Sequence, residues 1–478
     1  MRHQRHRALN NLKLSRLFHR AILGLALLAG IKPLTGFAAT DAFPAQLLTF
    51  SAAKEQQARQ LAADLKLEVS PDIWTFFAAA KKGNWPDMTN AYARLRWRSS
   101  QYQGSYNDPT VSTPVWQTVI EAQTAYEAFA AGGQKYPLAF GEGIIQSIPP
   151  GSIYFGGTDP GRGLVTALCA AHAQAKPFYT LTQNALADNR YLDYLRSMYG
   201  RELYIPTTND LQKAFQFYAM DLQRRAKHDE EFPQEPRQIK PGENHQKTAD
   251  GQITISGQVS VMEINGLLVK QIFNHNPNCE FYVEESFPLD WMYPQLSPHG
   301  LIFKLNRAPL FELTPAMMEE DHAFWTKQCD AMLGNWLTPQ TTLSNVCAFA
   351  TKVYGQKDWS QFTGDPGYVT NGYATRMFSK LRSSGGGLYQ WRLKHQVGGA
   401  NRLRAETDYA FRQAFALCPT SPEAVYRYVN FLMDEKRIND AIRLVRTAWT
   451  LAPDNQQFQS LLSQLLDTRR QQNQKATQ

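Results

Sequence analysis

Apolar residues recur every three to four positions through the first part of the chain. Ile73, Phe76, Phe77 and Ala80 form one such stripe. This spacing is typical of an amphipathic helix that buries one face. Residues 40–135 are therefore predicted to form a helical N-terminal region.

Short β-rich runs alternate with helical patterns between residues 136 and 310. The clearest unit is a strand at Ser152–Phe155, followed by a glycine-rich loop and a helix, and Phe178–Thr182 gives a second strand. This alternation is the pattern of βαβ units around a parallel sheet. The predicted fold class is α/β plus all-α, in which a central parallel or mixed sheet has flanking helices and the C-terminal region consists of helical hairpins.

The segment at 229–250 interrupts this α/β domain. It is rich in Pro, Glu, Gln and Lys and has almost no apolar residues. Such a composition buries too little apolar surface to offset the entropy of ordering the chain, so a mobile surface insert is predicted. Residues 311–400 are helical again and form a predicted connector, with Gly385–Gly387 expected to break or hinge its last helix.

A repeat with a period of 34 residues follows in residues 401–470. Phe411–Pro419 matches Val445–Pro453 at this offset. The period and the pattern of small and large residues resemble the tetratricopeptide repeat family. The resemblance implies helical hairpins that bind a protein partner, although Val429 stands where the family favours Gly or Ala.

The basic residues of the chain are concentrated at its N-terminus. The 478-residue chain has a formal net charge of +8, and residues 1–39 contain seven Lys or Arg and no Asp or Glu. A basic start, an apolar run at Ala21–Ile31 and small residues before Thr40 follow the order of a secretory signal peptide. We therefore expect a secreted or periplasmic product. If the signal is not cleaved, residues 21–39 anchor the chain in a membrane.

The rest of the chain is nearly neutral, so its composition does not indicate a nucleic-acid partner. One basic stretch remains at residues 376–404, which contain no Asp or Glu. The predicted basic partner surface consists of Arg376, Lys380, Arg382, Arg392 and Lys394. Two interpretations stand: a surface for an anionic glycan, membrane or acidic partner, or a solvated helix face balanced by acids elsewhere.

The ends of the predicted strands carry the strongest candidates for a ligand site. These are Thr158, Asp159, Arg162, Asn184, Glu284 and Glu285. Parallel strands end at the same edge of a sheet, where open α/β sheets bind ligands. The alternative is that these residues form turns and solvated strand ends.

Motifs for metals, cofactors and common hydrolase chemistry are missing from the sequence. Glu319 and His322 have the spacing of a carboxylate di-iron site, but the required second copy does not occur. No catalytic residue, metal or cofactor is predicted. Cys329 and Cys347 are a candidate disulfide pair if their helices pack face to face, and otherwise are buried apolar residues.

Residues 145–310 also resemble the soluble extracytoplasmic part of bacterial protein-mannosyltransferase-like membrane proteins. The similarity lies in Pro149–Asp159, Pro177–Asn184 and Glu280–Arg307. It implies a periplasmic α/β module with a repeat tail. It does not imply transferase activity, because in that superfamily the chemistry is assigned to a carboxylate of the membrane portion.

Two functions follow from the sequence. The first is an exported protein-binding or scaffold protein of the cell envelope that uses its helical repeats. The second is an enzyme, or an accessory to one, in envelope glycan or lipid-linked sugar metabolism that uses the carboxyl edge of the sheet.

Overall fold

The computed structural model describes eight segments of the chain. They are residues 43–101, 104–156, 160–171, 178–240, 242–247, 253–284, 289–396 and 399–477. The expected signal peptide at 1–39 lies outside the described residues, as do Thr158, Asp159 and Glu285.

The described residues divide into two compact units, of which the first covers 43–289 and the second 290–477. The elements of the first unit are α2 (Ala45–Asp64), α3 (Pro71–Ala80), α4 (Trp85–Arg98), α5 (Trp116–Gly132), α6 (Lys135–Ile145), β1 (Ile153–Gly156), η1 (Pro160–Leu164), α7 (Val165–Ala171), β2 (Tyr179–Thr182), η2 (Gln183–Ala185), α8 (Asn189–Tyr199), α9 (Thr208–Glu231), β3 (Asn244–Lys247), β4 (Ile253–Ser256), α10 (Gln258–His275) and β5 (Phe281–Val283).

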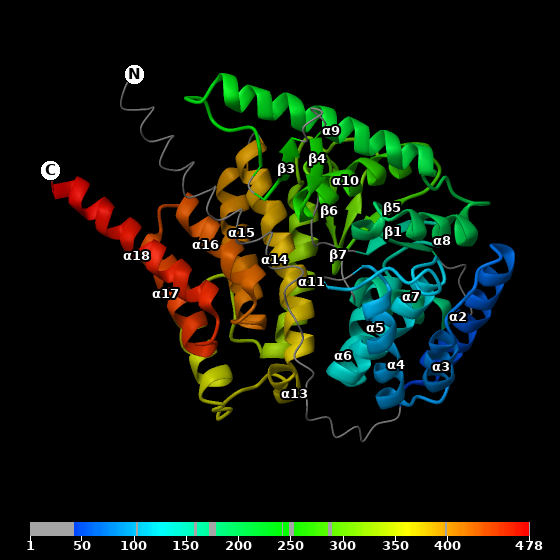
Figure 1. Ribbon diagram of the computed structural model, residues 1–478. Helices are drawn as coiled ribbons and strands as arrows, with labels where there is room; N and C mark the ends of the chain where they lie inside the picture. Colours follow the sequence, from blue (N-terminus) through cyan, green and yellow to red (C-terminus); the bar gives the residue numbers. More distant parts are fainter. Residues whose placement is uncertain are drawn as a thin grey trace. The chain divides into compact units, whose positions relative to one another are not determined.

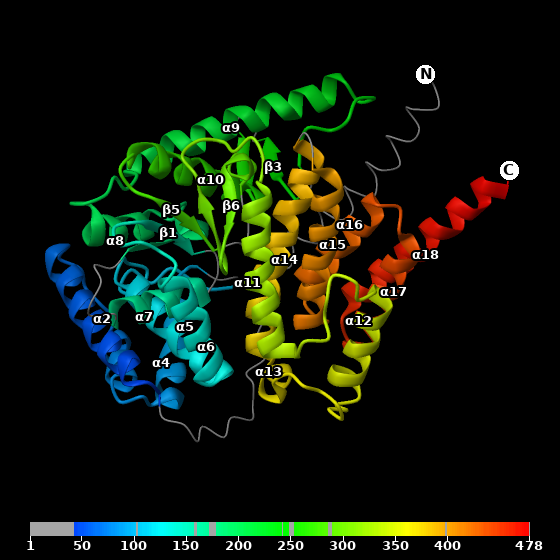
Figure 2. The ribbon, with the colours of Figure 1, turned by 180° about the vertical axis from the view of Figure 1, so that it is seen from behind.

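Three parallel strands form the sheet of the first unit, in the order β2-β1-β5. Ile153 of β1 lies opposite Tyr179 on one side and Phe281 on the other. All four residues of β1 are buried, which is typical of a strand covered on both faces. In Figures 1 and 2, α5 and α7 lie below β1 and β5, and α9 and α10 lie above them. The predicted βαβ arrangement is confirmed for these strands.

The predicted insert at 229–250 contains secondary structure in its described residues. Helix α9 continues to Glu231, and β3 pairs with β4 in an antiparallel ladder. Both carboxylate oxygens of Asp229 accept hydrogen bonds, from the backbone N–H groups of Gln238 and Ile239, at 2.6 and 3.0 Å. The Asp229 carboxylate therefore connects residues 238 and 239 to the end of α9.

The second unit begins with a β-hairpin and continues as helices. Its elements are η3 (Tyr293–Gln295), β6 (Leu296–His299), β7 (Ile302–Leu305), α11 (Pro315–Leu333), α12 (Leu343–Ala350), η4 (Thr351–Gly355), α13 (Pro366–Thr370), α14 (Gly372–His395), α15 (Ala400–Leu417), α16 (Pro422–Asp434), α17 (Ile438–Leu451) and α18 (Gln456–Thr477). Strands β6 and β7 are antiparallel, and Gly300 in their turn has a φ of 60°, a conformation that glycine adopts readily. The hairpin thus falls in the unit that starts at residue 290, whereas the sequence placed the boundary at 310.

Helix α14 corrects another prediction. It runs without a break from Gly372 to His395, through the three consecutive glycines that were expected to interrupt it. A Cβ atom at Gly386 would lie 2.7 Å from the ring of Phe411. The glycine therefore allows α15 to approach α14 closely, and the contact with α15 supports the helix through its weakest segment.

Candidate functional site

Helix α16 shows why the repeat segment folds into hairpins. The Ser421 hydroxyl accepts a hydrogen bond from the backbone N–H of Ala424 at 3.4 Å, and Pro422 occupies the first turn. Both features are typical of helix N-termini. The packing faces of α16 and α17 are fully buried: Val425, Tyr428, Leu432, Ala441, Val445 and Ala448.

Helix α18 closes the run of repeat helices. Phe458 and Leu465 are fully buried, whereas Gln459 and Ser463 are exposed. A repeat array needs such a terminal element, because the last apolar face has no following repeat to cover it.

The part of the connector that precedes α13, residues 337–354, covers one side of α15. The Tyr354 hydroxyl donates hydrogen bonds to the carbonyls of Ala416 and Leu417, at 3.0 and 2.8 Å. The Tyr409 hydroxyl of α15 donates in turn to the carbonyl of Leu337 at 2.9 Å. These contacts hold the connector against α15, so this side of α15 is part of the core of the unit.

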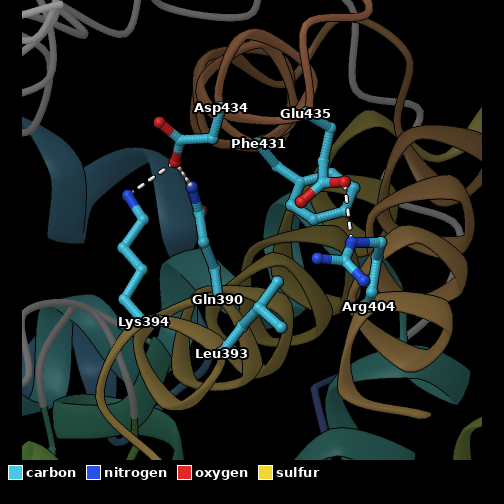
Figure 3. A pocket seen from close by; sticks show the side chains of 7 residues that line it. All are labelled: Gln390, Leu393, Lys394, Arg404, Phe431, Asp434 and Glu435. Atoms are coloured by element: carbon cyan, nitrogen blue, oxygen red, sulfur yellow. Dashed lines mark hydrogen bonds and ion pairs between the residues drawn. The ribbon is translucent and has the colours of Figure 1, made fainter. Parts of the chain in front are cut away.

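A cavity of about 330 Å³ lies between α14, α15 and α16. Figure 3 shows the seven residues that line it, which are Gln390, Leu393, Lys394, Arg404, Phe431, Asp434 and Glu435. They come from the C-terminal ends of α14 and α16, the start of α15 and the residue after α16.

Two ion pairs form opposite walls of this cavity. Lys394 Nζ lies 2.5 Å from Asp434 Oδ2, which also accepts a hydrogen bond from Gln390 Nε2 at 2.8 Å. On the other wall, Arg404 Nε lies 2.7 Å from Glu435 Oε2. Exposed pairs of this kind contribute at most about 1 kcal/mol to stability, so their main effect is on the charge and shape of the cavity.

The middle of the cavity is apolar. Phe431 is 1% exposed and Leu393 is half-buried, and Figure 3 shows both side chains between the two ion pairs. Five of the seven lining residues are polar or charged, so the cavity presents a mostly polar surface.

Two members of the predicted basic surface are not on the surface, which corrects that prediction. Arg382 is fully buried, and its Nη1 lies 2.8 Å from Asp321 Oδ2. Arg392 is 2% exposed, and its Nη2 donates to the Pro294 carbonyl at 2.8 Å. Each guanidinium holds other segments of the unit against α14. Burial lowers the pKa of Arg392.

The other three residues of the predicted basic surface are at least partly exposed when this unit is considered by itself. Arg376 and Lys394 are exposed and Lys380 is half-buried. Lys394 pairs with Asp434 in the cavity wall, and nearby Arg404 pairs with Glu435. Acids from other helices thus balance part of the basic stretch.

Of the residues predicted to form a ligand site at the sheet edge, the described ones contact other parts of the chain. Arg162 Nη2 donates to Gln117 Oε1 at 2.7 Å, and its guanidinium lies 5.0 Å from the centre of the Tyr191 ring. The Asn184 carbonyl accepts a hydrogen bond from Asn265 Nδ2 at 3.0 Å. These residues hold neighbouring helices and turns together.

Glu284 follows β5 and is almost fully buried. The Tyr154 hydroxyl donates to its Oε2 at 3.3 Å, and a Cβ atom at Gly161 would overlap the same oxygen. The glycine after the first strand therefore makes room for a carboxylate of the chain itself. A carboxylate here disfavours an anion such as phosphate at the start of η1.

The first unit also contains a buried ionic cluster that the sequence analysis did not predict. Lys54 Nζ lies 2.6 Å from Glu121 Oε2 and donates to the Tyr194 hydroxyl at 2.8 Å. Burial works against the charge of Glu121, but Lys54 and Arg162 lower its pKa on balance. Burial and the Glu121 charge raise the pKa of Tyr194 well above its ordinary value. The residues are distant in sequence, so no local motif relates them.

A second cavity of about 330 Å³ lies along α3 and α4, in the first unit. Its lining includes Lys82, Asp87 and Arg94. Neither this cavity nor the one between α14, α15 and α16 is lined by Arg162, Asn184 or Glu284.

The residues considered for a metal site or a disulfide make other contacts. His322 Nδ1 lies 2.9 Å from Glu406 Oε2, while Glu319 pairs with Arg402. Among the described residues, no three His, Cys, Asp or Glu side chains are placed to hold a metal ion. All five cysteines are free thiols, and burial raises the pKa of Cys329 to about 12.

Comparison with known proteins bears on the C-terminal helices. Residues 406–465 match the tetratricopeptide repeat family. No curated protein and no solved structure matches the chain. Within the part of the chain that the structure describes, no helix is both long and apolar enough to cross a membrane. The C-terminal segment therefore contains a tetratricopeptide repeat, and repeats of this class generally mediate protein–protein interaction.

Proposed function

We propose that this protein is an exported scaffold of the cell envelope that binds a polypeptide partner through α14 and α16. The observation that carries the proposal is the cavity between these helices, which adjoins the residues that match the tetratricopeptide repeat. Each helical hairpin of such an array buries one face against its neighbours and presents another face for binding.

The connector supports the choice of this side. Tyr354 and Tyr409 fix the connector to α15, so that side of the hairpins is already covered within the unit. The side with α14 and α16 carries the cavity and the half-buried Arg427, which lies near Gly387 of α14. A polypeptide that follows α16 would contact both.

The binding proposal is tested by site-specific photo-crosslinking in the full chain. A photoreactive amino acid at position 427 of α16 is compared with one at exposed position 446 of α17. We expect one partner polypeptide to be cross-linked from 427, with little or none from 446. Equal cross-linking from both positions would show that the proposed face has no special role.

Export is supported by the sequence of residues 1–39, in which a basic segment precedes an apolar run and small residues. Mass spectrometry of the protein from the envelope of the producing cell tests it. We expect a mature N-terminus near Thr40. Recovery of the protein with Met1 intact would contradict cleavage, and recovery from the cytoplasm would contradict export.

A further inference from the structure

Helix α9 of the first unit carries two large apolar side chains that face the solvent. Phe217 is 64% exposed and Met220 is 71% exposed. Figures 1 and 2 show the helix along the outside of the unit. The opposite face of the helix is buried within the unit through Leu211, Ala214, Tyr218 and Leu222. The packing of the unit therefore leaves the face with Phe217 and Met220 uncovered, and exposed apolar neighbours of this kind mark binding surfaces.

Basic side chains lie at both ends of this apolar pair. Lys213 precedes Phe217 by four residues, and Arg224 follows Met220 by four residues. Residues three and four apart share one face of a helix, so these four residues form a single stripe. Among residues 208–229, the exposed charged side chains are all basic: Lys213, Arg224 and Lys227.

The acidic residues beside the stripe make contacts within the chain. Asp221 lies 2.7 Å from the buried Arg225 and 2.8 Å from Arg224. Asp210 accepts hydrogen bonds from the hydroxyl and the backbone N–H of Thr207. Exposed acids begin at Glu230, beyond the stripe. The stripe therefore offers a partner an apolar centre between exposed positive charges.

A second copy of the chain fits this stripe poorly. If two α9 helices packed antiparallel, with Phe217 of each against Met220 of the other, Lys213 would meet the second Arg224. In a parallel pair each cation would meet its own equivalent. Like charges that face each other across an interface disfavour it. The stripe is therefore complementary to a different molecule, with negative groups around an apolar region.

The shape of the stripe favours a lipid surface as that molecule. Phe217 and Met220 protrude from a helix, and neither of the two cavities described above is lined by a residue of α9. Protruding side chains need matching pockets in a folded partner, whereas a fluid bilayer admits them without a pocket. Apolar and aromatic side chains together with Lys and Arg are the groups by which helices bind anionic membrane surfaces.

We propose that the first unit binds an anionic lipid surface through α9. Phe217 and Met220 insert among the lipids, and Lys213 and Arg224 contact the lipid phosphates. This surface belongs to a different unit from the proposed polypeptide-binding face, so each proposal stands or fails separately.

Photo-cross-linking of the full chain to lipid vesicles tests the proposal. The photoreactive residue p-benzoylphenylalanine, which keeps an aromatic ring at position 217, is compared with the same residue at exposed position 56 of α2. The vesicles contain phosphatidylcholine and phosphatidylglycerol. We expect at least about tenfold more lipid adducts from 217, because insertion follows the apolar area that becomes buried. Equal labelling from both positions would overturn the proposal.

The positive charges are tested in the same cross-linking from position 217. Lys213→Glu with Arg224→Glu is expected to lower the lipid labelling at least about fivefold. The matched control, Lys66→Glu with Lys82→Glu, changes the net charge equally at exposed positions outside α9. It is expected to keep the labelling within about twofold, because charges far from the contact are screened. An equal loss in both variants would contradict a contact between the lipid phosphates and α9.

Cross-linking from position 217 in the producing cell separates a lipid from a polypeptide. We expect lipid adducts. Adducts to one polypeptide, without lipid adducts, would overturn the lipid proposal and assign the stripe to a protein partner.

Discussion

At the scale of single residues, Arg382 shows that a basic residue in a basic stretch can belong to the core. The sequence placed it in a basic stretch, but its side chain is fully buried against Asp321. The Tyr389 hydroxyl donates to the same aspartate oxygen at 2.6 Å, and Arg382 Nε donates to Gln413 Oε1 at 2.7 Å. Burial works to lower the pKa of Arg382, but Asp321 and the neighbouring Tyr389 raise it on balance.

This arrangement predicts a large effect of Asp321→Asn. The substitution leaves a buried guanidinium without its counter-charge, which typically costs about 3–5 kcal/mol. Chemical denaturation measures the free energy of unfolding. Glu319→Gln on the same helix removes an exposed pair with Arg402 and is expected to cost less than about 1 kcal/mol. Similar losses for both variants would contradict the buried pair.

Glu121 makes the stability of the first unit depend on pH. Its pKa in the folded chain is below the ordinary value of 4.5, so the unfolded chain takes up the proton at a higher pH than the folded chain does. The stabilisation by Glu121 is therefore complete above the ordinary value and is lost as the pH falls through the lower folded value.

We expect Glu121→Gln to reduce this dependence. The variant is less stable near neutral pH, because Lys54 is left buried without its partner, but it loses less further stability below a pH of about 4.5. Denaturation curves at several pH values measure the slope. Glu68→Gln, at an exposed position, serves as the control and is expected to keep the slope of the unchanged protein. An unchanged slope in Glu121→Gln would contradict the prediction.

At the scale of elements, the glycines of α14 show how packing overrides local preference. Glycine in a helix interior costs about 1 kcal/mol relative to alanine, which is why a break was expected at Gly385–Gly387. The helix continues because Gly386 faces the ring of Phe411 at a distance that excludes a side chain. A Cβ atom at the neighbouring Gly387 would meet only the flexible end of Arg427, at 3.6 Å.

The two neighbouring glycines predict opposite effects of alanine. Gly386→Ala forces Phe411 or the backbone to move and is expected to destabilise the protein by about 1–3 kcal/mol. Gly387→Ala gains helix propensity and is expected to be neutral or to stabilise by up to about 1 kcal/mol. Thermal denaturation of the two variants compares them directly. A stabilising Gly386→Ala would show that the α14–α15 contact is looser than described.

Secondary structure was predictable where one signal dominated. The strands β1 and β2 were predicted from short β-rich runs that alternate with helical patterns, and α16 and α17 from the 34-residue repeat. The sequence did not predict β3 or β4, because each of these short strands depends on its pairing with the other. It did not predict β6 either, which has a Pro at position 298 and pairs with β7.

At the scale of the whole molecule, the chain contains two cores. The first unit holds a parallel sheet with helices on both sides, and the second holds a hairpin and the repeat helices. The buried pairs Lys54–Glu121 and Arg382–Asp321 belong to different units. Each pair is therefore expected to stabilise its own core.

Hydrogen exchange measured by mass spectrometry tests this division. Asp321→Asn is expected to raise exchange in α11, α14 and α15, with little change in α2 and α5. Glu121→Gln is expected to do the reverse. Equal increases in both units from either variant would show that the chain unfolds as one cooperative body.

The sequence by itself determined the βαβ pattern of β1 and β2, the helical hairpins and the 34-residue repeat, because each depends on residues that are close in the chain. It also located seven basic residues in the first 39. Only the tertiary structure decided which charges are exposed. Arg382, Arg392 and Glu284 became internal contacts, because groups from distant segments of the chain satisfy their hydrogen bonds in the core. Lys394 and Arg404 stay exposed and pair with Asp434 and Glu435.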